Sequence, residues 1–266
     1  MSGVGAVLAK AKAQGRAALV GYLPVGFPDV PGSIDAMVAM VEAGVDIVEI
    51  GVPYTDPLMD GPVIAHAADV ALQNGTRFSD VFTAVRAVAD AGAPALVMTY
   101  WNPVLRYGVD RFADDLAKAG GAGLITPDLI PDEGAEWMAA AERNDLDHVF
   151  LVAPSSTAQR LRSTTSACSG FVYAASSMGV TGARTTVGDA AEVLVTRTRL
   201  MTDTPICVGL GVSTGAQAAQ VAAFADGVIV GSALVRCLTD AASRAAGITA
   251  LRELCGELAA GVRKGR

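Results

Sequence analysis

Two acidic residues, Glu49 and Asp60, flank a turn rich in glycine and proline, in the segment VEIGVPYTDPLMDGP at 48–62. Glu49 lies in an apolar stretch that ends a predicted strand, where an unpaired carboxylate is costly unless it is protonated or neutralised. A carboxyl group whose pKa is raised by such surroundings can exchange protons near neutral pH. We therefore predict that Glu49 is a general acid/base; the alternative is a structural ion pair with a cation.

Asp60 lies in a loop that the glycine and proline residues between 53 and 62 make irregular. Asp-Gly-Pro is a common turn sequence, so Asp60 alone is well explained as a turn residue or a helix N-cap. Its position on the same strand–loop unit as Glu49 favours a chemical role instead. We predict that Asp60 is the second catalytic residue.

Glycines follow two neighbouring predicted strands, in GLGVS at 209–213 and in GSA at 231–233. A glycine-rich strand end that leads into a helix lets backbone N–H groups approach an anion, and the helix dipole favours negative charge. Gly182 lies in a third segment, 173–184, whose hydroxyl-bearing and small residues predict a lid loop. Together these features predict a phosphate site.

Four residues, Tyr22, Ile64, Met98 and Tyr100, are predicted to line an apolar pocket for a planar ring. Each of them taken alone is more often a core residue. No cluster of cysteines or histidines has the spacing of a metal site, so no metal is predicted.

Eight short apolar runs, at 17–23, 46–51, 95–100, 123–126, 148–152, 170–174, 206–210 and 227–231, alternate with segments of helical periodicity. Continuous Val/Ile/Leu runs are typical of strands buried on both faces of a parallel sheet. The pattern predicts an α/β fold, a (β/α)8 TIM barrel formed by one domain over 1–266. An extra N-terminal helix is expected at 4–13, closing the bottom of the barrel, and a last helix at 247–262. Active sites of such barrels lie at the C-terminal ends of the strands, where Glu49 and the glycines are placed.

The formal net charge of −7 and a pI near 4.8 argue against binding to nucleic acid. No apolar run is long enough to span a bilayer, and the N-terminal segment lacks the apolar core of a signal peptide. These observations predict a cytoplasmic protein with reduced cysteines.

The motifs together resemble the alpha subunit family of tryptophan synthase. The resemblance rests on VEIGVPYTDPLMDGP, TYWNP at 99–103, GLITPDLIPDE at 123–133, FVYAASSMGVTGAR at 171–184, VGLGVS at 208–213 and GVIVGSAL at 227–234. It implies a lyase that cleaves indole-3-glycerol phosphate to indole and glyceraldehyde 3-phosphate by a retro-aldol reaction. Three residues depart from the family pattern, Thr55, Met59 and Leu210, and none of them removes an acid or a glycine of the predicted sites.

The resemblance also implies residue roles. Glu49 is then the general acid/base, and Asp60 accepts a hydrogen bond from the indole N–H. Tyr173 matches an active-site tyrosine, and Thr181 matches a lid threonine that positions Asp60. The implied phosphate-binding residues are Gly182, Gly211, Gly231 and Ser232, and Tyr22 takes the place of an aromatic beside the indole.

A partner is implied as well, a beta subunit that uses pyridoxal phosphate and receives the indole in an αββα heterotetramer. Pro53, Asp56 and Asn102 are the residues expected at or near that interface. No cofactor is expected in this chain. Three alternatives stay open: a stand-alone lyase that releases indole, a non-catalytic activator of a beta subunit, and another phosphate-binding barrel related to thiamine-phosphate synthase.

Overall fold

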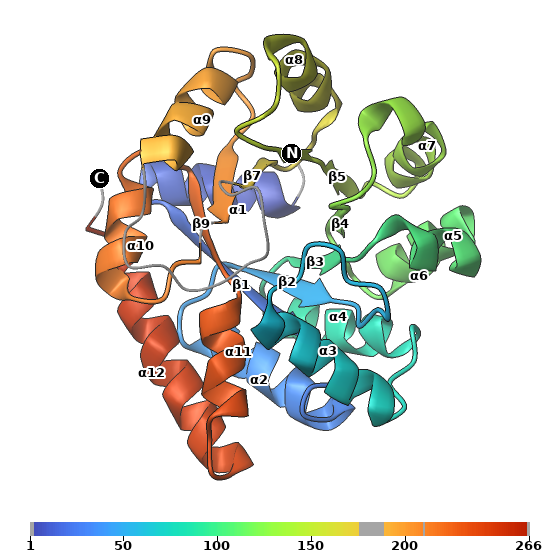
Figure 1. The fold of residues 1–266 in the computed structure, drawn as a ribbon, viewed down its shortest axis with the longest axis vertical. Helices are drawn as coiled ribbons and strands as arrows, with labels where there is room; N and C mark the ends of the chain where they lie inside the picture. Colours follow the sequence, from blue (N-terminus) through green and yellow to red (C-terminus); the bar gives the residue numbers. More distant parts are fainter. Residues whose placement is uncertain (1–2, 176–188, 210, 265–266) are drawn as a thin grey trace.

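The computed structural model of the chain describes residues 3–175, 189–209 and 211–264. Its parallel strands follow the order β5-β4-β3-β2-β1-β9-β8-β7-β6 and curve into a barrel surrounded by helices (Figure 1). The strands are β1 (Ala18–Pro24), β2 (Ile47–Gly51), β3 (Ala95–Met98), β4 (Gly123–Ile125), β5 (Asp147–Val149), β6 (Leu151–Val152), β7 (Val172–Ala175), β8 (Ile206–Gly209) and β9 (Gly227–Val230).

The predicted strand at 148–152 is divided at Phe150 into β5 and β6. β5 pairs with β4, whereas β6 pairs with β7, so this one divided strand connects the two ends of the sheet. If β5 and β6 are counted as one strand, the described sheet has eight strands. The two ends of each strand lie within two residues of the ends of a predicted run. The predicted (β/α)8 barrel is therefore confirmed.

Helices fill the connections between the strands. They are α1 (Gly3–Ala13), α2 (Val30–Glu42), α3 (Pro62–Gln73), α4 (Asp80–Asp90), α5 (Trp101–Tyr107), α6 (Val109–Lys118), α7 (Ala135–Arg143), α8 (Ala158–Ala167), α9 (Asp189–Arg199), α10 (Gly215–Ala222), α11 (Ser232–Thr239) and α12 (Arg244–Val262), with a 3₁₀ turn at Pro131–Glu133. No helix within the described ranges is long and apolar enough to cross a membrane.

The extra N-terminal helix closes one end of the barrel, as predicted. Val4, Leu8 and Ala11 of α1 are buried in the same cluster as the inward-facing residues of the strands. This cluster occupies the half of the barrel near the strand starts. The opposite end, where Glu49 lies, is left open for a site.

The start of the last helix differs from the prediction. α12 begins three residues before the predicted 247, because the Ser243 side chain accepts a hydrogen bond from the Ala246 N–H and caps the helix. Between β4 and β5, Gly134 separates the 3₁₀ turn from α7.

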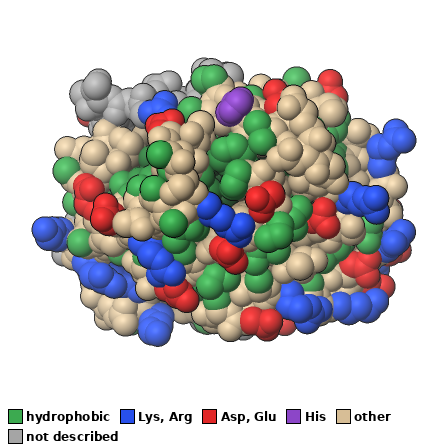
Figure 2. Space-filling view, turned by 90° about the horizontal axis from the view of Figure 1, so that it is seen from below, with side chains coloured by type: hydrophobic (Ala, Val, Ile, Leu, Met, Phe, Trp, Pro, Cys, Tyr) green, Lys and Arg blue, Asp and Glu red, His purple; other side chains and the backbone are tan. Residues whose placement is uncertain are grey.

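The outer surface carries acidic and basic side chains interspersed, as the face in Figure 2 shows. Two ion pairs join the last helix to α2: Arg244 with Asp35 at 2.6 Å, and Arg252 with Glu42. Both pairs are exposed, so each contributes little to stability. Apolar packing of α12 against α10, α11 and α2 fixes the position of the C-terminal helix instead.

Candidate active site

Glu49 lies inside the barrel near the C-terminal end of β2 and is completely buried. Side chains alternate along a strand, so Glu49 faces the same way as Ile47, which belongs to the interior cluster. Neither carboxyl oxygen has a hydrogen-bond partner among the described residues. Burial raises the pKa of Glu49 to about 8. The structural ion pair considered above is not found in this part of the chain, and Glu49 is protonated at neutral pH.

Two tyrosines lie within electrostatic reach of Glu49. Tyr22 on β1 is its register partner across the β1–β2 ladder, and Tyr173 projects from β7. Burial, followed by the nearby acids, raises the pKa of Tyr22 well above its usual value. Burial first, and then Glu49, does the same to Tyr173. Both phenols therefore stay protonated and can donate hydrogen bonds beside the acid.

Asp60 approaches the same end of the barrel from the loop after β2. It is not the cap of the next helix, because α3 has Gly61 at that position. The Tyr100 hydroxyl donates a hydrogen bond to Asp60 Oδ1 at 3.3 Å. Partial burial raises the pKa of Asp60, and the bond from Tyr100 acts in the opposite direction. The interpretation of Asp60 as a simple turn or cap residue is not supported.

Tyr100 also accepts a hydrogen bond from the Met59 N–H at 2.9 Å, so one phenol holds two successive loop residues. The Tyr54 ring packs against Tyr100 with centroids 5.4 Å apart, and Asn102 donates to the Tyr54 hydroxyl at 3.1 Å. Sequence reasoning missed this bracing role, since it treated Tyr100 as pocket lining. The available signal was a hydroxyl-bearing aromatic at the end of the strand adjacent to β2.

Two of the predicted ring-binding residues, Tyr22 and Ile64, lie close together. A Cβ placed on Gly231 would lie 3.4 Å from Tyr22 Cδ1 and 3.7 Å from Ile64 Cδ1, so these three residues adjoin one another. Ile64 is buried on α3, and Met98 ends β3 partly buried against the interior cluster. Tyr22 and Ile64 thus adjoin each other beside Gly231, and Met98 packs against the interior cluster.

The glycine-rich ends lie after β8 and β9. Gly211 has φ +71°, a conformation that strongly favours glycine. Gly231 precedes α11, a short helix inserted before the last one, and Ser232 begins this helix almost fully buried. The first N–H groups of a helix lack intrahelical partners and can bind an anion. Thr181 and Gly182 lie outside the described residues.

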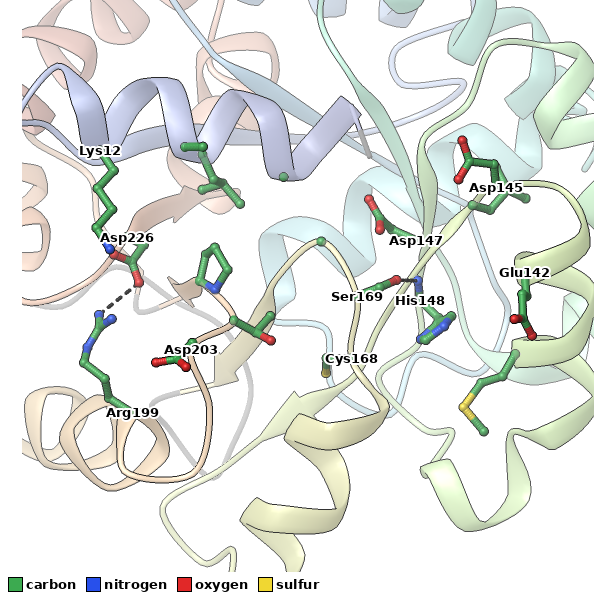
Figure 3. Close-up of a pocket in the computed structure, with 18 residues that line it drawn as sticks. Lys12, Glu142, Asp145, Asp147, His148, Cys168, Ser169, Arg199, Asp203 and Asp226 are labelled. Atoms are coloured by element: carbon green, nitrogen blue, oxygen red, sulfur yellow. Dashed lines mark hydrogen bonds and ion pairs between the residues drawn. The ribbon is translucent and has the colours of Figure 1, made fainter. Parts of the chain in front are cut away.

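A hollow of about 800 Å³ lies at the opposite end of the barrel, beneath α1 (Figure 3). Its lining includes Lys12, Asp147, Arg199 and Asp226 and contains none of the predicted site residues. Arg199 pairs with Asp226 at 2.9 Å, and Asp226 also accepts the Ile206 N–H at 3.0 Å. These contacts join the starts of β8 and β9. The bottom of a TIM barrel is typically where such stabilising contacts, rather than catalytic residues, are found.

Among the residues whose positions are described, no group of three or more His, Cys, Asp or Glu side chains is placed to hold a metal ion. All four cysteines are free. At the open end of the barrel, the described residues offer carboxyl groups, phenols and backbone N–H groups.

Comparisons with known proteins agree with the sequence resemblance. A family model described as tryptophan synthase alpha chain matches residues 8–263. The chain is 63% identical to the tryptophan synthase alpha chain of Salinispora arenicola over 99% of this chain and 98% of that one. It is 61% identical to that of Mycobacterium tuberculosis, over 99% and 96% of the two chains.

Solved structures give the same result. A structure of Mycobacterium tuberculosis tryptophan synthase superposes with a TM-score of 0.93 at 61% identity, over 98% of each chain. A tryptophan synthase alpha chain from Legionella pneumophila gives 0.88 at 29% identity, over 98% of this chain and 97% of that one. The family match over nearly the whole length, together with this fold, shows that the chain belongs to the tryptophan synthase alpha chain family.

Proposed function

We propose that this chain uses Glu49 as the general acid/base and Asp60 as the charged group beside the indole nitrogen. The reaction follows from family membership: the chain is a lyase, and it cleaves indole-3-glycerol phosphate to indole and glyceraldehyde 3-phosphate. One observation above all supports Glu49 as its acid. This carboxyl is fully buried without a partner among the described residues and has a pKa of about 8.

Two proton transfers are needed, and one carboxyl suits both. Protonated Glu49 gives its proton to C3 of the indole ring, which leaves a cationic indolenine. The resulting Glu49 carboxylate then takes the proton of the glycerol hydroxyl next to C3. The carbon–carbon bond breaks as the aldehyde forms, and its electron pair restores the aromatic indole. A carboxyl with a pKa near the working pH can both donate and accept.

Asp60 has the complementary task. Its carboxylate accepts a hydrogen bond from the indole N–H and stabilises the positive charge that protonation at C3 creates. The hydrogen bond from Tyr100 at 3.3 Å favours the charged form that this role requires. Thr181, by family resemblance, is proposed to hold Asp60 from the lid.

The remaining assignments follow the shape of the site. Tyr22, Ile64 and Met98 line the ring pocket, with Tyr100 and Tyr173 at its edge. Gly211, Gly231 and Ser232 bind the phosphate together with Gly182, at the position where many barrels bind phosphate beside a short extra helix. All described strands, from β1 at Ala18 to β9 at Val230, belong to one sheet, which supports a single domain over 1–266.

The catalytic proposal is tested by measuring indole release from indole-3-glycerol phosphate. Glu49→Gln and Asp60→Asn should each lower kcat by at least about a hundredfold, as expected for the loss of a general acid/base or of a charge in the site. Circular dichroism should show that both variants stay folded. A Glu49→Gln enzyme with near-normal turnover would assign the proton transfers to another group.

Family membership implies a beta-subunit partner, and we propose that the open end of the barrel binds it. Large apolar side chains are exposed here on the segments after β2, β3 and β4: Leu58 is 78% exposed, Leu105 52% and Ile130 39%. Two of them share a segment with the predicted interface residues: Leu58 follows Pro53 and Asp56 in the loop after β2, and Leu105 lies with Asn102 on α5. An exposed apolar surface favours a partner-bound enzyme over a stand-alone lyase.

We propose that the chain forms an αββα complex in which the partner carries pyridoxal phosphate. We also propose that the complex is cytoplasmic. Leu58→Asp should weaken binding to the beta chain by at least about tenfold, because it places a charge in an apolar contact. Leu200→Asp is the matched control, since Leu200 is 79% exposed but lies at the end of α9. Analytical ultracentrifugation of the mixture gives the stoichiometry. Equal binding by both variants would contradict this location of the interface.

A further inference from the structure

We infer that the hydroxyl group of Tyr22 is a positioning group for Glu49, donating a hydrogen bond to the carboxylate that forms when Glu49 gives up its proton. The inference rests on the proposed role of Glu49 as the general acid/base. The Tyr22 ring alone suffices to line an indole pocket, so that role leaves the hydroxyl unexplained. The position of the hydroxyl relative to Glu49 accounts for its presence.

Tyr22 and Glu49 are opposite each other in the β1–β2 ladder. Both follow the inward-facing alternation of their strands, so both side chains project into the barrel. The Tyr22 side chain then leans along the sheet, with its Cβ and Cδ1 beside Gly231, which follows β9, and its hydroxyl against Gly51 of β2. The ring therefore spans β1 and delivers its hydroxyl to the strand of Glu49.

Gly51 makes this arrangement possible. A Cβ on Gly51 would overlap the Tyr22 hydroxyl, so any larger residue would displace the phenol. Gly51 follows Glu49 by two residues and faces the same side of the strand. The hydroxyl thus occupies the space directly above the Glu49 side chain, toward the open end of the barrel. A carboxyl group at Glu49 reaches this space by rotation about its own side-chain bonds.

Glu49 needs such a donor only during turnover. Its two oxygens have no hydrogen-bond partner within the described ranges, which a neutral carboxyl tolerates far better than a carboxylate. Once the proton moves to C3, a buried negative charge remains. Among the described residues, the groups within electrostatic reach of this charge are the phenols of Tyr22 and Tyr173 and the thiol of Cys207, none of which is a cation.

Of these groups, Tyr22 is the one directed toward β2. The Tyr173 hydroxyl lies against Gly209 of β8, where a Cβ would come within 2.5 Å of it, and β9 and β1 separate β8 from β2. The Cys207 thiol is a weak donor. Its sulfur lies against Gly227 of β9, where an added Cβ would come within 2.4 Å of it. Burial keeps the Tyr22 phenol protonated, as its raised pKa indicates. Asp60 and Tyr100 also lie near Tyr22, but Asp60 already has a donor in Tyr100.

The hydroxyl does not transfer a proton in this scheme. Glu49 gives its proton to C3, the carboxylate accepts a hydrogen bond from Tyr22, and the carboxylate then takes the proton of the glycerol hydroxyl. Tyr22 keeps its own proton throughout. Its effect is to stabilise the charged state between the two transfers and to hold the carboxylate near both reacting atoms.

The test uses Tyr22→Phe in the full chain bound to its beta subunit, because this change removes the hydroxyl and keeps the ring. We expect kcat for indole release to fall roughly tenfold or more with KM little changed, as for a lost hydrogen bond to a charged group. The alkaline limb of the kcat/KM profile should move to higher pH by roughly one unit, because the Glu49 carboxylate loses a hydrogen-bond donor and the pKa of Glu49 rises. Tyr107→Phe is the matched control, since the Tyr107 hydroxyl bonds Asp115 on the outer helices.

A second measurement does not depend on activity. The carboxyl carbon of Glu49, labelled with ¹³C and assigned by its loss in Glu49→Gln, is titrated by NMR. Its pKa should rise in Tyr22→Phe and stay unchanged in Tyr107→Phe. If Glu49→Gln kept full activity, the proposed function would fail, whereas this titration would still show whether Tyr22 stabilises the carboxylate.

Three outcomes would overturn the inference. The first is a Tyr22→Phe enzyme with an unchanged kcat and an unchanged Glu49 titration. The second is a change in KM alone, which would make the hydroxyl a substrate contact. The third is a shift of the Glu49 titration in Tyr173→Phe but not in Tyr22→Phe, which would assign the donor role to the other phenol.

Discussion

The hydroxyl group of Tyr100 donates a hydrogen bond to Asp60 at 3.3 Å and accepts one from the N–H of Met59 at 2.9 Å. A residue that follows β3 by two positions thereby fixes a loop that follows β2. The loop contains few regular hydrogen bonds of its own, since prolines and glycines interrupt it. The position and the charge of Asp60 thus both depend on a side chain from the neighbouring strand.

Tyr100→Phe should impair catalysis without unfolding the protein. Burial raises the pKa of Asp60 and the bond from Tyr100 lowers it, so removing the bond raises this pKa further. If Asp60 acts as an anion, the acidic limb of kcat/KM then moves to higher pH, and kcat falls roughly tenfold because the loop loses its anchor. The pH dependence of indole release checks this. The same profile in Tyr100→Phe and in the wild-type chain would show that Asp60 is held by something else.

Glu49→Gln should stabilise the fold at alkaline pH while it abolishes activity. Between about pH 4.5, where Glu49 titrates in the unfolded chain, and about pH 8, where it titrates when folded, the native state holds a proton that the unfolded state has lost. Rising pH therefore favours unfolding of the wild-type chain. We compare the free energy of unfolding of the variant with that of the wild type at each pH. The variant's advantage should be larger near pH 8 than near pH 5, by up to a few kcal/mol.

Urea unfolding at the two pH values measures this difference. Glu253→Gln is a suitable control, because Glu253 is exposed on α12 and its replacement should leave the pH dependence unchanged. Between pH 5 and pH 8, the free energy of unfolding of the wild type should fall relative to that of Glu49→Gln. The absence of this fall would contradict the raised pKa of Glu49.

Asp46→Ala should lower the free energy of unfolding by roughly 2–3 kcal/mol, because it leaves Arg16 partly buried and unpaired. Arg16 contacts both oxygens of Asp46, at 2.7 and 2.8 Å, and Asp46 also accepts the Leu19 N–H. Asp110→Ala removes an exposed partner of Arg143 instead and should cost less than about 1 kcal/mol. Urea unfolding compares the two variants; equal losses would mean that burial of the Arg16 pair has no effect.

Gly231→Ala should weaken phosphate binding and leave the fold intact. An added Cβ would lie 3.4 Å or more from Tyr22 and Ile64, an ordinary contact, but it would occupy space in front of the α11 N-terminus. KM for indole-3-glycerol phosphate should rise roughly tenfold or more with a smaller change in kcat. Gly256→Ala on α12 is the control, since a Cβ there meets nothing within 4 Å. An unchanged KM in Gly231→Ala would move the phosphate site elsewhere.

Much of the fold could be predicted because its signals are local. Each apolar run of Val, Ile and Leu fixes a strand wherever it lies, and the intervening periodicity fixes the helices. The helix boundaries were less predictable, since caps such as Ser243 act through a single side chain that competes with the periodic pattern. The division of one strand at Phe150 has no local signal, because it arises where the barrel closes.

The sequence by itself determined which chemical groups are present: a carboxyl group in an apolar strand, an acid in an irregular loop, and glycines after two neighbouring strands. Only the tertiary structure decided their state. Glu49 is neutral because its side chain is fully buried inside the barrel and its two oxygens have no hydrogen-bond partner among the described residues. Tyr100 and Tyr22 face the acids because adjacent parallel strands bring them there from distant positions in the chain. Burial and cross-strand proximity are properties of the whole barrel, so no single segment of the sequence contains them.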